Sequence, residues 1–334
     1  MNTTPDSELV AFAREAGLLG SDEEGVWTPL TGGVSSDIWR LDAGGRSICV
    51  KRALAQLKVA ADWRVPVARN LYEWRWIEWV WKAFPGAAPE PLAMDEMRGA
   101  FAMAYLPATA FPLWKQQLLS GKVHVASAVA VGDLLGRIHA RSAADGRLAA
   151  HFPTDTLFHA LRLEPYLRAT GAHHPRVAQR LTDLAARTAE TKRVLVHGDV
   201  SPKNILIGAS GPVLLDAECA WWGDPAFDLA FCLNHLLLKR IVVPQAKDDL
   251  AASFTALSDA YLAHVNWEPR AEIEGRVATL LPALLLARVD GKSPVEYLGD
   301  AAPRVRAAAL TMLNAPRDHI ADVLTDFTKL TEQR

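Results

Sequence analysis

The sequence predicts an α+β fold built from two unequal parts, a small strand-rich N-terminal part and a larger, mainly helical C-terminal part. Between residues 30 and 51, short apolar runs are separated by Gly-rich turns, which is typical of an antiparallel sheet. From residue 113 onward, apolar residues recur at the three- and four-residue steps of helices. The chain has 334 residues, which is long enough for each part to bury a core of its own.

The N-terminal part is expected to hold a small sheet and one long helix. The long helix is indicated by apolar residues at helical spacing from Val67 to Trp81, before Pro85 ends it. The expected elements are, in order, a helix over 6–17, two strands within 30–41, a hairpin turn at 42–45, a strand over 47–51, the helix over 65–84 and a strand over 100–106.

The C-terminal part is expected to be a bundle of helices that surrounds two short apolar strands. Pro107 is a candidate hinge, so the chain divides into an N-lobe of residues 1–107 and a C-lobe of residues 108–334. The helices expected in the C-lobe cover residues 113–119, 123–142, 156–166, 177–191, 227–239, 249–264, 273–287 and 303–314.

The composition is that of an ordinary globular protein, with 50% hydrophobic and 22% charged residues. A net charge of −2 gives no reason to expect nucleic acid or an anionic membrane as a partner. Three irregularly spaced cysteines argue against a disulfide framework and against a thiolate metal site. The N-terminus lacks the pattern of a signal peptide, and the longest apolar run, at 277–287, is too short to span a bilayer. A cytoplasmic location is therefore expected, and the oligomeric state is left open.

Two short loops carry the groups that phosphoryl transfer requires. The apolar run Val194–Val196 leads into His197-Gly198-Asp199, and Asn204 follows shortly after. A second apolar run, at 213–215, ends in Asp216. Transfer of a phosphoryl group from ATP needs one carboxylate near the attacking hydroxyl, and an amide and a second carboxylate for Mg²⁺. The spacing therefore predicts kinase chemistry.

Each of these residues has a predicted role. Asp199 is predicted to be the catalytic base, and the alternative is that it caps a turn. Asn204 and Asp216 are predicted to hold Mg²⁺ through hard oxygen atoms. Glu218 follows Asp216 by two positions, so it either adds a second carboxylate to the metal site or lies in solvent. His197 is expected to shape the turn.

Lys51 is predicted to contact the α- and β-phosphates of the nucleotide from the end of its strand. The alternative is an exposed edge lysine. A carboxylate should hold this lysine in place, and the long helix offers Glu73 and Glu78. Glu73 is preferred because it precedes Trp74 of the apolar stripe.

The small-residue turn at 32–36 and the segment after Asp216 have supporting roles. Gly32, Gly33 and Ser35 are predicted to place backbone N–H groups over the phosphates. The absence of a G-x-x-x-x-G-K-[ST] motif excludes a P-loop NTPase. Asp224 is expected to cap a helix, and Asp228 in its first turn is expected to brace the catalytic loop.

Together, His197-Gly198-Asp199, Asn204, Asp216 and the run 223–230 resemble the aminoglycoside phosphotransferase and choline kinase superfamily. This resemblance implies a bilobal, protein-kinase-like fold with ATP between a five-stranded N-lobe and a helical C-lobe. Unlike in protein kinases, Gly198 precedes Asp199 and no Ala-Pro-Glu segment follows Asp216, which suggests an enzyme without phosphorylation control.

A narrower resemblance connects the chain with 5-methylthioribose kinase. It is carried by Asp216-Ala217-Glu218 and by the segments 51–54 and 61–64. Asn204 departs from that kinase, whose catalytic loop usually lacks an Asn there. The resemblance therefore implies the ATP and Mg²⁺ machinery more strongly than the sugar substrate.

The acceptor is expected to lie on the C-lobe, facing Asp199. Trp221 and Trp222 either form walls for a sugar or quaternary ammonium group or pack beneath the loop. Arg288 either pairs with a buried acid, for which Asp290 is a candidate, or contacts the substrate. The acidic surplus of 241–334 is small, which argues weakly against polycationic aminoglycosides as acceptors.

The sequence thus predicts an ATP- and Mg²⁺-dependent phosphotransferase that acts on a hydroxyl of a small molecule, such as a sugar, an amino alcohol or an aminoglycoside-like compound. Two alternatives belong to other classes. One is a catalytically silent, nucleotide-binding pseudokinase, which should have lost a member of the set Lys51, Asp199, Asn204 and Asp216. The other is a metallohydrolase, which should have further His or Asp ligands at metal-binding spacing.

Overall fold

The computed structural model describes residues 4–30, 36–54 and 67–332. The chain forms two compact units. The first comprises Met1–Ala110 and Leu215–Glu218, and the second comprises Phe111–Leu214 and Cys219–Arg334. The division at Pro107 had placed the segment Leu215–Glu218 in the C-lobe. In the structure this segment belongs to the first unit, and its two carboxylates pair with cations of that unit, as described below.

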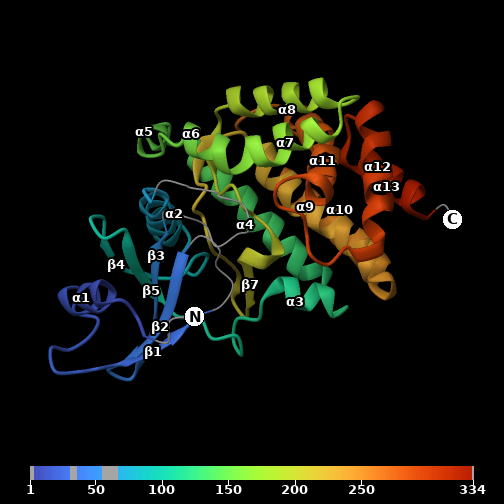
Figure 1. Cartoon of the computed structure of the whole chain (residues 1–334). Coiled ribbons are helices and arrows are strands. Elements are labelled where there is room, and N and C mark those ends of the chain that lie inside the picture. The colour runs from blue at the N-terminus through green and yellow to red at the C-terminus, as the bar shows by residue number, and fades with distance from the viewer. Residues whose placement is uncertain (1–3, 31–35, 55–66, 333–334) are drawn as a thin grey trace. The chain divides into compact units, whose positions relative to one another are not determined.

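The first unit contains the predicted antiparallel sheet, with five strands in the order β1-β2-β3-β5-β4 (Figure 1). The sharp turn between β2 and β3 uses Gly44 and Gly45, whose φ angles of 56° and 73° suit glycine in a tight hairpin. The strands are β1 (Val26–Pro29), β2 (Ser36–Ala43), β3 (Arg46–Ala53), β4 (Pro91–Asp95) and β5 (Ala100–Ala104). The five-stranded sheet implied by the resemblance is confirmed.

Two helices cover different faces of this sheet. Side chains alternate along β3, so Ile48 and Val50 join the apolar cluster that includes α1 (Ser7–Glu15). Lys51 points to the other face, where it meets α2 (Arg69–Ala83). Asp6 caps α1 by accepting a hydrogen bond from the backbone N–H of Glu8 at 2.9 Å. The face of β3 toward α2 is therefore the one that carries a functional candidate.

The second unit is mainly helical and contains two small two-stranded sheets, β6 with β9 and β7 with β8. Its helices are α3 (Trp114–Leu119), α4 (Val125–Ala143), α5 (Leu148–His151), α6 (Asp155–Phe158), the π-helix η1 (His159–Arg168), α7 (Ala169–His173), α8 (Ala178–Glu190), α9 (Pro225–Val242), α10 (Lys247–Leu262), α11 (Arg270–Asp290), α12 (Ala302–Asn314) and α13 (Ile320–Glu332). Its strands are β6 (Val194–Val196), β7 (Ile205–Gly208), β8 (Gly211–Leu214) and β9 (Trp221–Gly223).

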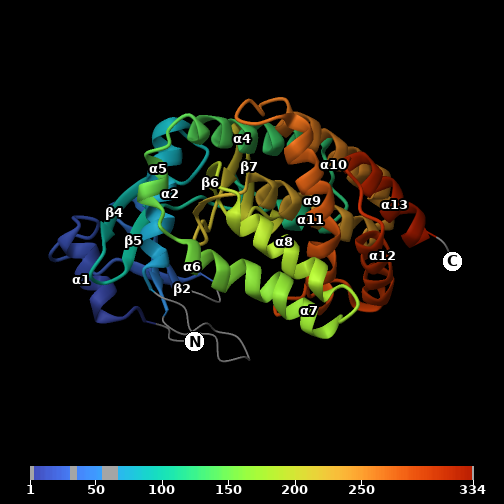
Figure 2. The same cartoon turned by 90° about the horizontal axis from the view of Figure 1, so that it is seen from above.

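The core of the second unit lies around α9. This helix is buried along most of its length, since α10 and α11 both pack against it. Helix α4 packs on α10, and α12 and α13 cover α11 toward the C-terminus (Figure 2). Among the helices of the described residues, none is both long and apolar enough to cross a membrane.

The helix predicted over 156–166 takes an unexpected form. It begins as α6 and continues as the π-helix η1, which contains Pro165. Proline has no N–H to donate to the preceding turn, so regular α-helical bonding is interrupted there. A π-helical segment of this kind often occurs at a functional site. It carries Arg162, which the sequence did not single out.

Helices α4 and α10 approach so closely that Gly132 leaves no room for a side chain. A Cβ atom at Gly132 would lie 2.2 Å from the backbone oxygen of Leu257. We expect Gly132→Ala to lower the free energy of unfolding by about 1–3 kcal/mol, because overpacking outweighs the gain of about 0.5–1 kcal/mol in helix propensity.

Urea denaturation measures this loss, and Gly275→Ala is the matched control. Gly275 is also helical, but its nearest non-local atom is 3.8 Å from the added Cβ, so the control should be neutral or stabilising. Equal unfolding midpoints for the two variants would show that α4 and α10 can separate at little cost.

Candidate functional site

Lys51 occupies a buried electrostatic network in the first unit. Its Nζ lies 2.8 Å from Glu73 Oε2 and 2.5 Å from Asp216 Oδ1. Burial by itself would lower the pKa of Lys51, but the Asp216 and Glu73 carboxylates hold that pKa above its ordinary value. The lysine therefore remains charged. Of the two glutamates considered from the sequence, Glu73 is the partner, and Glu78 pairs with exposed Lys82.

Asp216 has a left-handed backbone conformation with φ of 66°, and it is the one non-glycine residue in the described ranges with positive φ. Aspartate tolerates this conformation better than most residues, although it still costs energy. Asp216 lies just after β8, and in this conformation its carboxylate contacts Lys51. The side chain is 29% exposed, so its carboxylate is also accessible from solvent.

Glu218 was predicted to be either a metal ligand or a solvated residue. The structure places its Oε2 at 3.1 Å from Arg69 Nε, in a largely buried ion pair. Arg69 is fully buried at the start of α2 and also donates from Nη2 to the backbone oxygen of Leu54 at 2.7 Å. The sequence pattern did not single out Arg69. The carboxylate of Glu218, close to Asp216 in sequence, was the available signal, because a buried carboxylate needs a cationic partner.

The catalytic-loop candidate lies in the second unit, directly after β6. Gly198 has φ of 80°, and a Cβ there would approach the backbone oxygen of Cys219 to 2.6 Å, so this position favours glycine. The backbone N–H of Asp199 donates to His197 Nδ1 at 3.1 Å. The role expected for His197, to shape the turn, agrees with this contact.

Asp228 braces the same loop from the first turn of α9. Its two carboxylate oxygens accept hydrogen bonds from the backbone N–H groups of His197 at 2.7 Å and Gly198 at 2.8 Å. His139 Nε2 lies 3.3 Å from Asp228 Oδ2, and His139 Nδ1 lies 2.7 Å from Tyr261 Oη. All these groups are buried, so the position of Asp199 depends on an interior hydrogen-bond network.

Two cations contact the carboxylate of Asp199. Arg162 Nη2 and Lys203 Nζ each lie 3.1 Å from Asp199 Oδ2. Arg162 also donates from Nε to the backbone oxygen of Gly198 at 2.5 Å, so η1 holds both the loop and its acid. The other oxygen, Asp199 Oδ1, is buried and has no hydrogen-bond partner among the described residues. One oxygen is thus held, and the other remains available as an acceptor.

Asn204 is fixed by the loop that it follows. Its Nδ2 donates to the backbone oxygen of Asp199 at 3.1 Å, which assigns the amide nitrogen to the loop and leaves the amide oxygen as the candidate metal ligand. Among the described residues, no cluster of three or more His, Cys, Asp and Glu side chains could bind a metal ion. The amide of Asn204 and the accessible carboxylate of Asp216 are hard oxygen donors, which fit Mg²⁺.

The model of the phosphotransferase enzyme family matches residues 26–264, which is more than half of the chain. The chain belongs to the phosphotransferase enzyme family. The match covers the sheet, α2, the loop with Asp199 and Asn204, Asp216, and the helices up to α10.

Solved structures confirm the fold of this family member. Amicoumacin kinase in complex with AMP-PNP, Ca²⁺ and its ligand aligns with a TM-score of 0.56 and 16% identity, over 98% of both chains. A choline/ethanolamine kinase family protein from Mesorhizobium loti gives 0.51 and 16%, over 98% of this chain and 99% of the other. Spectinomycin phosphotransferase in complex with ADP and spectinomycin gives 0.50 and 11%, over 98% and 100%. No protein of curated function matches the chain by sequence.

The predicted nucleotide-binding turn lies outside the described residues. Gly32, Gly33 and Ser35 all belong to this stretch, so their role stays a prediction. The segment at 61–64, which carried part of the resemblance to 5-methylthioribose kinase, also lies outside them.

The two tryptophans on β9 differ in their surroundings. Trp221 is buried, stacks on Phe158 with ring centroids 4.0 Å apart, and donates from Nε1 to Asp155 at 2.6 Å. Core packing, the alternative considered from the sequence, accounts for Trp221. Trp222 points to the other face of β9 and is partly buried, so its contact with an acceptor stays a prediction.

Arg288 does not pair with Asp290. Its Nη1 donates to Tyr166 Oη at 3.0 Å and to Ser293 Oγ at 3.1 Å, while Asp290 binds His174 and Arg306. The suggested pairing with Asp290 was therefore wrong. Along a helix, consecutive residues point in different directions, and residues two apart also lie on different faces.

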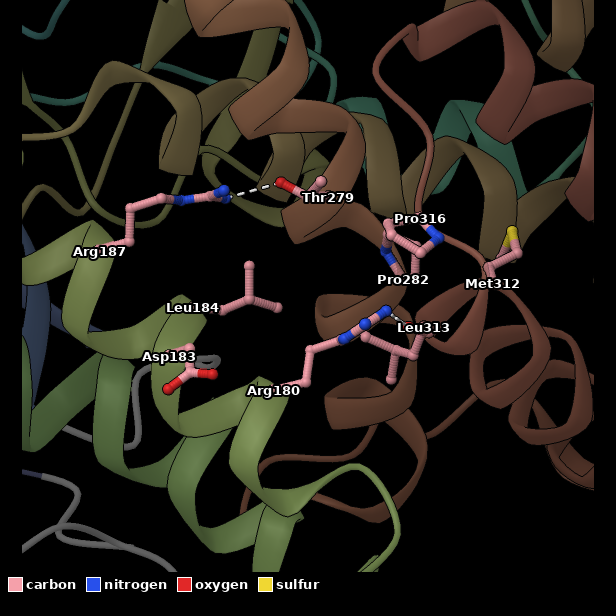
Figure 3. Close-up of a pocket in the computed structure, with 9 residues that line it drawn as sticks. All are labelled: Arg180, Asp183, Leu184, Arg187, Thr279, Pro282, Met312, Leu313 and Pro316. Atoms are coloured by element: carbon pink, nitrogen blue, oxygen red, sulfur yellow. Dashed lines mark hydrogen bonds between the residues drawn. The ribbon is translucent and has the colours of Figure 1, made fainter.

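A cavity of about 390 Å³ in this family member lies between α8, α11 and α12 (Figure 3). None of the predicted site residues lines it. Two arginines at its wall are directed to neighbouring groups, since Arg187 donates to Thr279 Oγ1 at 2.7 Å and Arg180 donates to the backbone oxygen of Leu313.

Proposed function

We propose that the protein transfers the γ-phosphate of ATP, with Mg²⁺, to a hydroxyl group of a small molecule. The observation that carries this proposal is Asp199, a buried carboxylate with one oxygen held by two cations and the other without a partner in the described residues. The family and the nucleotides bound by the similar solved structures support it.

Asp199 has the arrangement that a general base requires. Its Oδ1 would accept the proton of the acceptor hydroxyl while that oxygen forms a bond with the γ-phosphorus and ADP leaves. Arg162 and Lys203 contact Oδ2 and would hold the carboxylate in one orientation, which leaves Oδ1 for the incoming hydroxyl.

The first unit would supply the nucleotide contacts. Glu73 and Asp216 hold the Lys51 ammonium at the end of β3, where it would donate to phosphate oxygens. Asn204 and Asp216 would hold Mg²⁺, and the ion pair of Glu218 with Arg69 would keep the segment that carries Asp216 in place. When bound, Mg²⁺ neutralises charge that develops on the phosphates during transfer.

Nucleotide binding tests the role of Lys51. We expect Lys51→Met to weaken ATP binding, in the presence of Mg²⁺, by about tenfold or more, because a charge-assisted contact to phosphate is lost. Isothermal titration calorimetry measures the change, at a temperature well below the melting point because Glu73 is left buried without its cation.

The matched control is Lys82→Met, an exposed lysine on α2 that pairs with Glu78. It should bind ATP as the unmodified protein does. If Lys51→Met binds as tightly as the control, Lys51 does not contact the nucleotide. Release of ADP on a panel of sugars, amino alcohols and hydroxy acids then tests the transfer itself, and ATP binding without turnover on any acceptor would contradict the proposed activity.

A further inference from the structure

Four basic side chains are buried together in the second unit, around η1, α9 and α11. Lys239 is 1% exposed and Arg288 is 8% exposed, which is unusual for cationic side chains. Burying a cation is strongly unfavourable unless an anion accompanies it. The four residues are Arg162 on η1, His235 and Lys239 on α9, and Arg288 on α11.

An aromatic ring connects this basic cluster with the proposed catalytic base. The guanidinium carbons of Arg162 and Arg288 lie 5.7 Å and 5.6 Å from the centroid of the same ring, that of Tyr166. Arg162 in turn contacts Asp199. Arg288 and Arg162 therefore contact the same Tyr166 ring, and Arg162 also contacts the proposed base Asp199.

The other two members share a neutral partner. Lys239 Nζ lies 3.2 Å from Tyr297 Oη, and His235 Nδ1 lies 3.1 Å from the same hydroxyl. Lys115 Nζ lies 5.8 Å from the Tyr297 ring centroid. A phenol can accept a hydrogen bond from a lysine, but it provides no negative charge at neutral pH.

Too few carboxylates accompany these cations. Within the described part of the chain, neither Lys239 nor Arg288 forms an ion pair with a carboxylate. Asp199 is already shared by Arg162 and Lys203, and Glu296 is largely exposed and pairs with Lys115. The excess of positive charge next to Asp199 is therefore not neutralised by the protein.

Two buried nitrogen atoms without hydrogen-bond partners point to a ligand. In the described residues, Arg288 Nε and His235 Nε2 are buried and have no hydrogen-bond partner. Burial, together with the charges of Lys115 and Arg288, lowers the pKa of Lys239 to about 7. The pKa of His235 lies well below its ordinary value, first because the ring is buried and then because cations surround it. Those cations are Lys239, Arg288, Lys203 and Lys115.

We infer that the acceptor carries an anionic group, a carboxylate or a phosphate ester, besides the hydroxyl that is phosphorylated, and that this basic cluster binds it. This inference rests on the proposed function. Arg288 and Lys239 would bind the anion, and Lys203, whose side chain is 50% exposed, would meet it at the entrance. An anion there supplies the charge that the buried cations lack.

The same charges disfavour cationic acceptors. An aminoglycoside or a quaternary ammonium alcohol would bring positive charge next to Arg162, Lys203 and Arg288. Hydroxy acids and phosphorylated alcohols therefore fit the cluster best, and of the acceptor classes predicted from the sequence, aminoglycoside-like compounds fit least.

The test compares neutral, anionic and cationic acceptors. Glycerol, glycerate and glycerol 3-phosphate share a three-carbon frame, and choline and kanamycin serve as cationic probes. Binding to the full-length protein is measured by calorimetry with and without saturating ADP, and ADP release is measured with Mg²⁺ and ATP. We expect glycerate or glycerol 3-phosphate to bind about tenfold or more tightly than glycerol, and the stronger of the two identifies carboxylate or phosphate.

Variants locate the binding to the cluster. Arg288→Met and Lys239→Met, which keep an apolar stem of similar length, should each weaken binding of the anionic probe by about ten- to a hundredfold and raise its KM more than they change kcat. Arg288→Lys should recover part of the loss. Lys292→Met is the control, since this exposed lysine pairs with Glu164.

Three outcomes would overturn the inference: equal binding of glycerol and both anions, tighter binding of choline or kanamycin, or unchanged anion binding in both Met variants. A failure of the proposed function is seen separately. In that case ATP and ADP would not bind or no acceptor would be phosphorylated, while the anion titrations without nucleotide would still report on the cluster.

Discussion

Asp199→Asn should lower kcat by at least about a hundredfold and leave ATP affinity nearly unchanged. The amide keeps the size of the carboxylate but cannot accept a proton from the hydroxyl at neutral pH. Its nitrogen would also face Arg162 or Lys203, each of which lies 3.1 Å from the carboxylate in the native protein. The residues proposed to bind the nucleotide are different ones, so ATP binding should persist.

Steady-state ADP release with a responsive acceptor measures the change in kcat, and calorimetry measures ATP affinity. Asp183→Asn is a suitable control, because Asp183 is exposed on α8 and accepts a hydrogen bond from Gln179 on the same helix. Asp199→Asn with more than about a tenth of the normal kcat would remove the residue from its role as base.

Asp228→Asn should have the second large effect, on stability and activity together. Asp228 accepts buried backbone hydrogen bonds from His197 and Gly198 and contacts His139. An Asn has only one acceptor oxygen, so its NH₂ group would oppose one of these donors. We expect a loss of at least about 2 kcal/mol in the free energy of unfolding, because a charge-assisted bond is lost and a buried donor is left unpaired.

Urea denaturation and kcat are measured on the same preparation of this variant. The control is Asp133→Asn on α4, which disrupts a partly exposed Asp–His contact with His264 and should cost less than about 1 kcal/mol. If both variants unfold alike, the hydrogen bonds to the loop contribute little. If Asp228→Asn is unstable but fully active, Asp228 does not position Asp199.

Much of the fold was predictable because local patterns agreed with it. The glycines at 44–45, the apolar stripe of α2 and the amphipathic helices after residue 113 all act over short distances along the chain. Strand β4 was not predicted, since all five of its residues are only partly buried and show no alternation. Helix α13 was also missed, and the conversion of 159–168 into a π-helix depends on bonding that no residue pattern reveals.

The candidate site shows the same limit. The spacing of Asp199, Asn204 and Asp216 indicated the chemistry, and the position of Glu73 in the stripe indicated the partner of Lys51. Arg69, Arg162 and Lys203 were not singled out, because their partners are distant in sequence or because a lysine in a loop is common. Asp290 was proposed as a partner from sequence proximity alone, and that criterion failed.

The membership of Leu215–Glu218 in the first unit limits how the chain can be dissected. A fragment truncated after Ala110 would contain Lys51 and Arg69 but would lack Asp216 and Glu218, their carboxylate partners from the distant segment. Two interior cations would then be left with incomplete charge compensation. The first unit is therefore not expected to be an autonomous module, and a fragment that includes residues 215–218, by circular permutation or fusion, should be more stable than one without them.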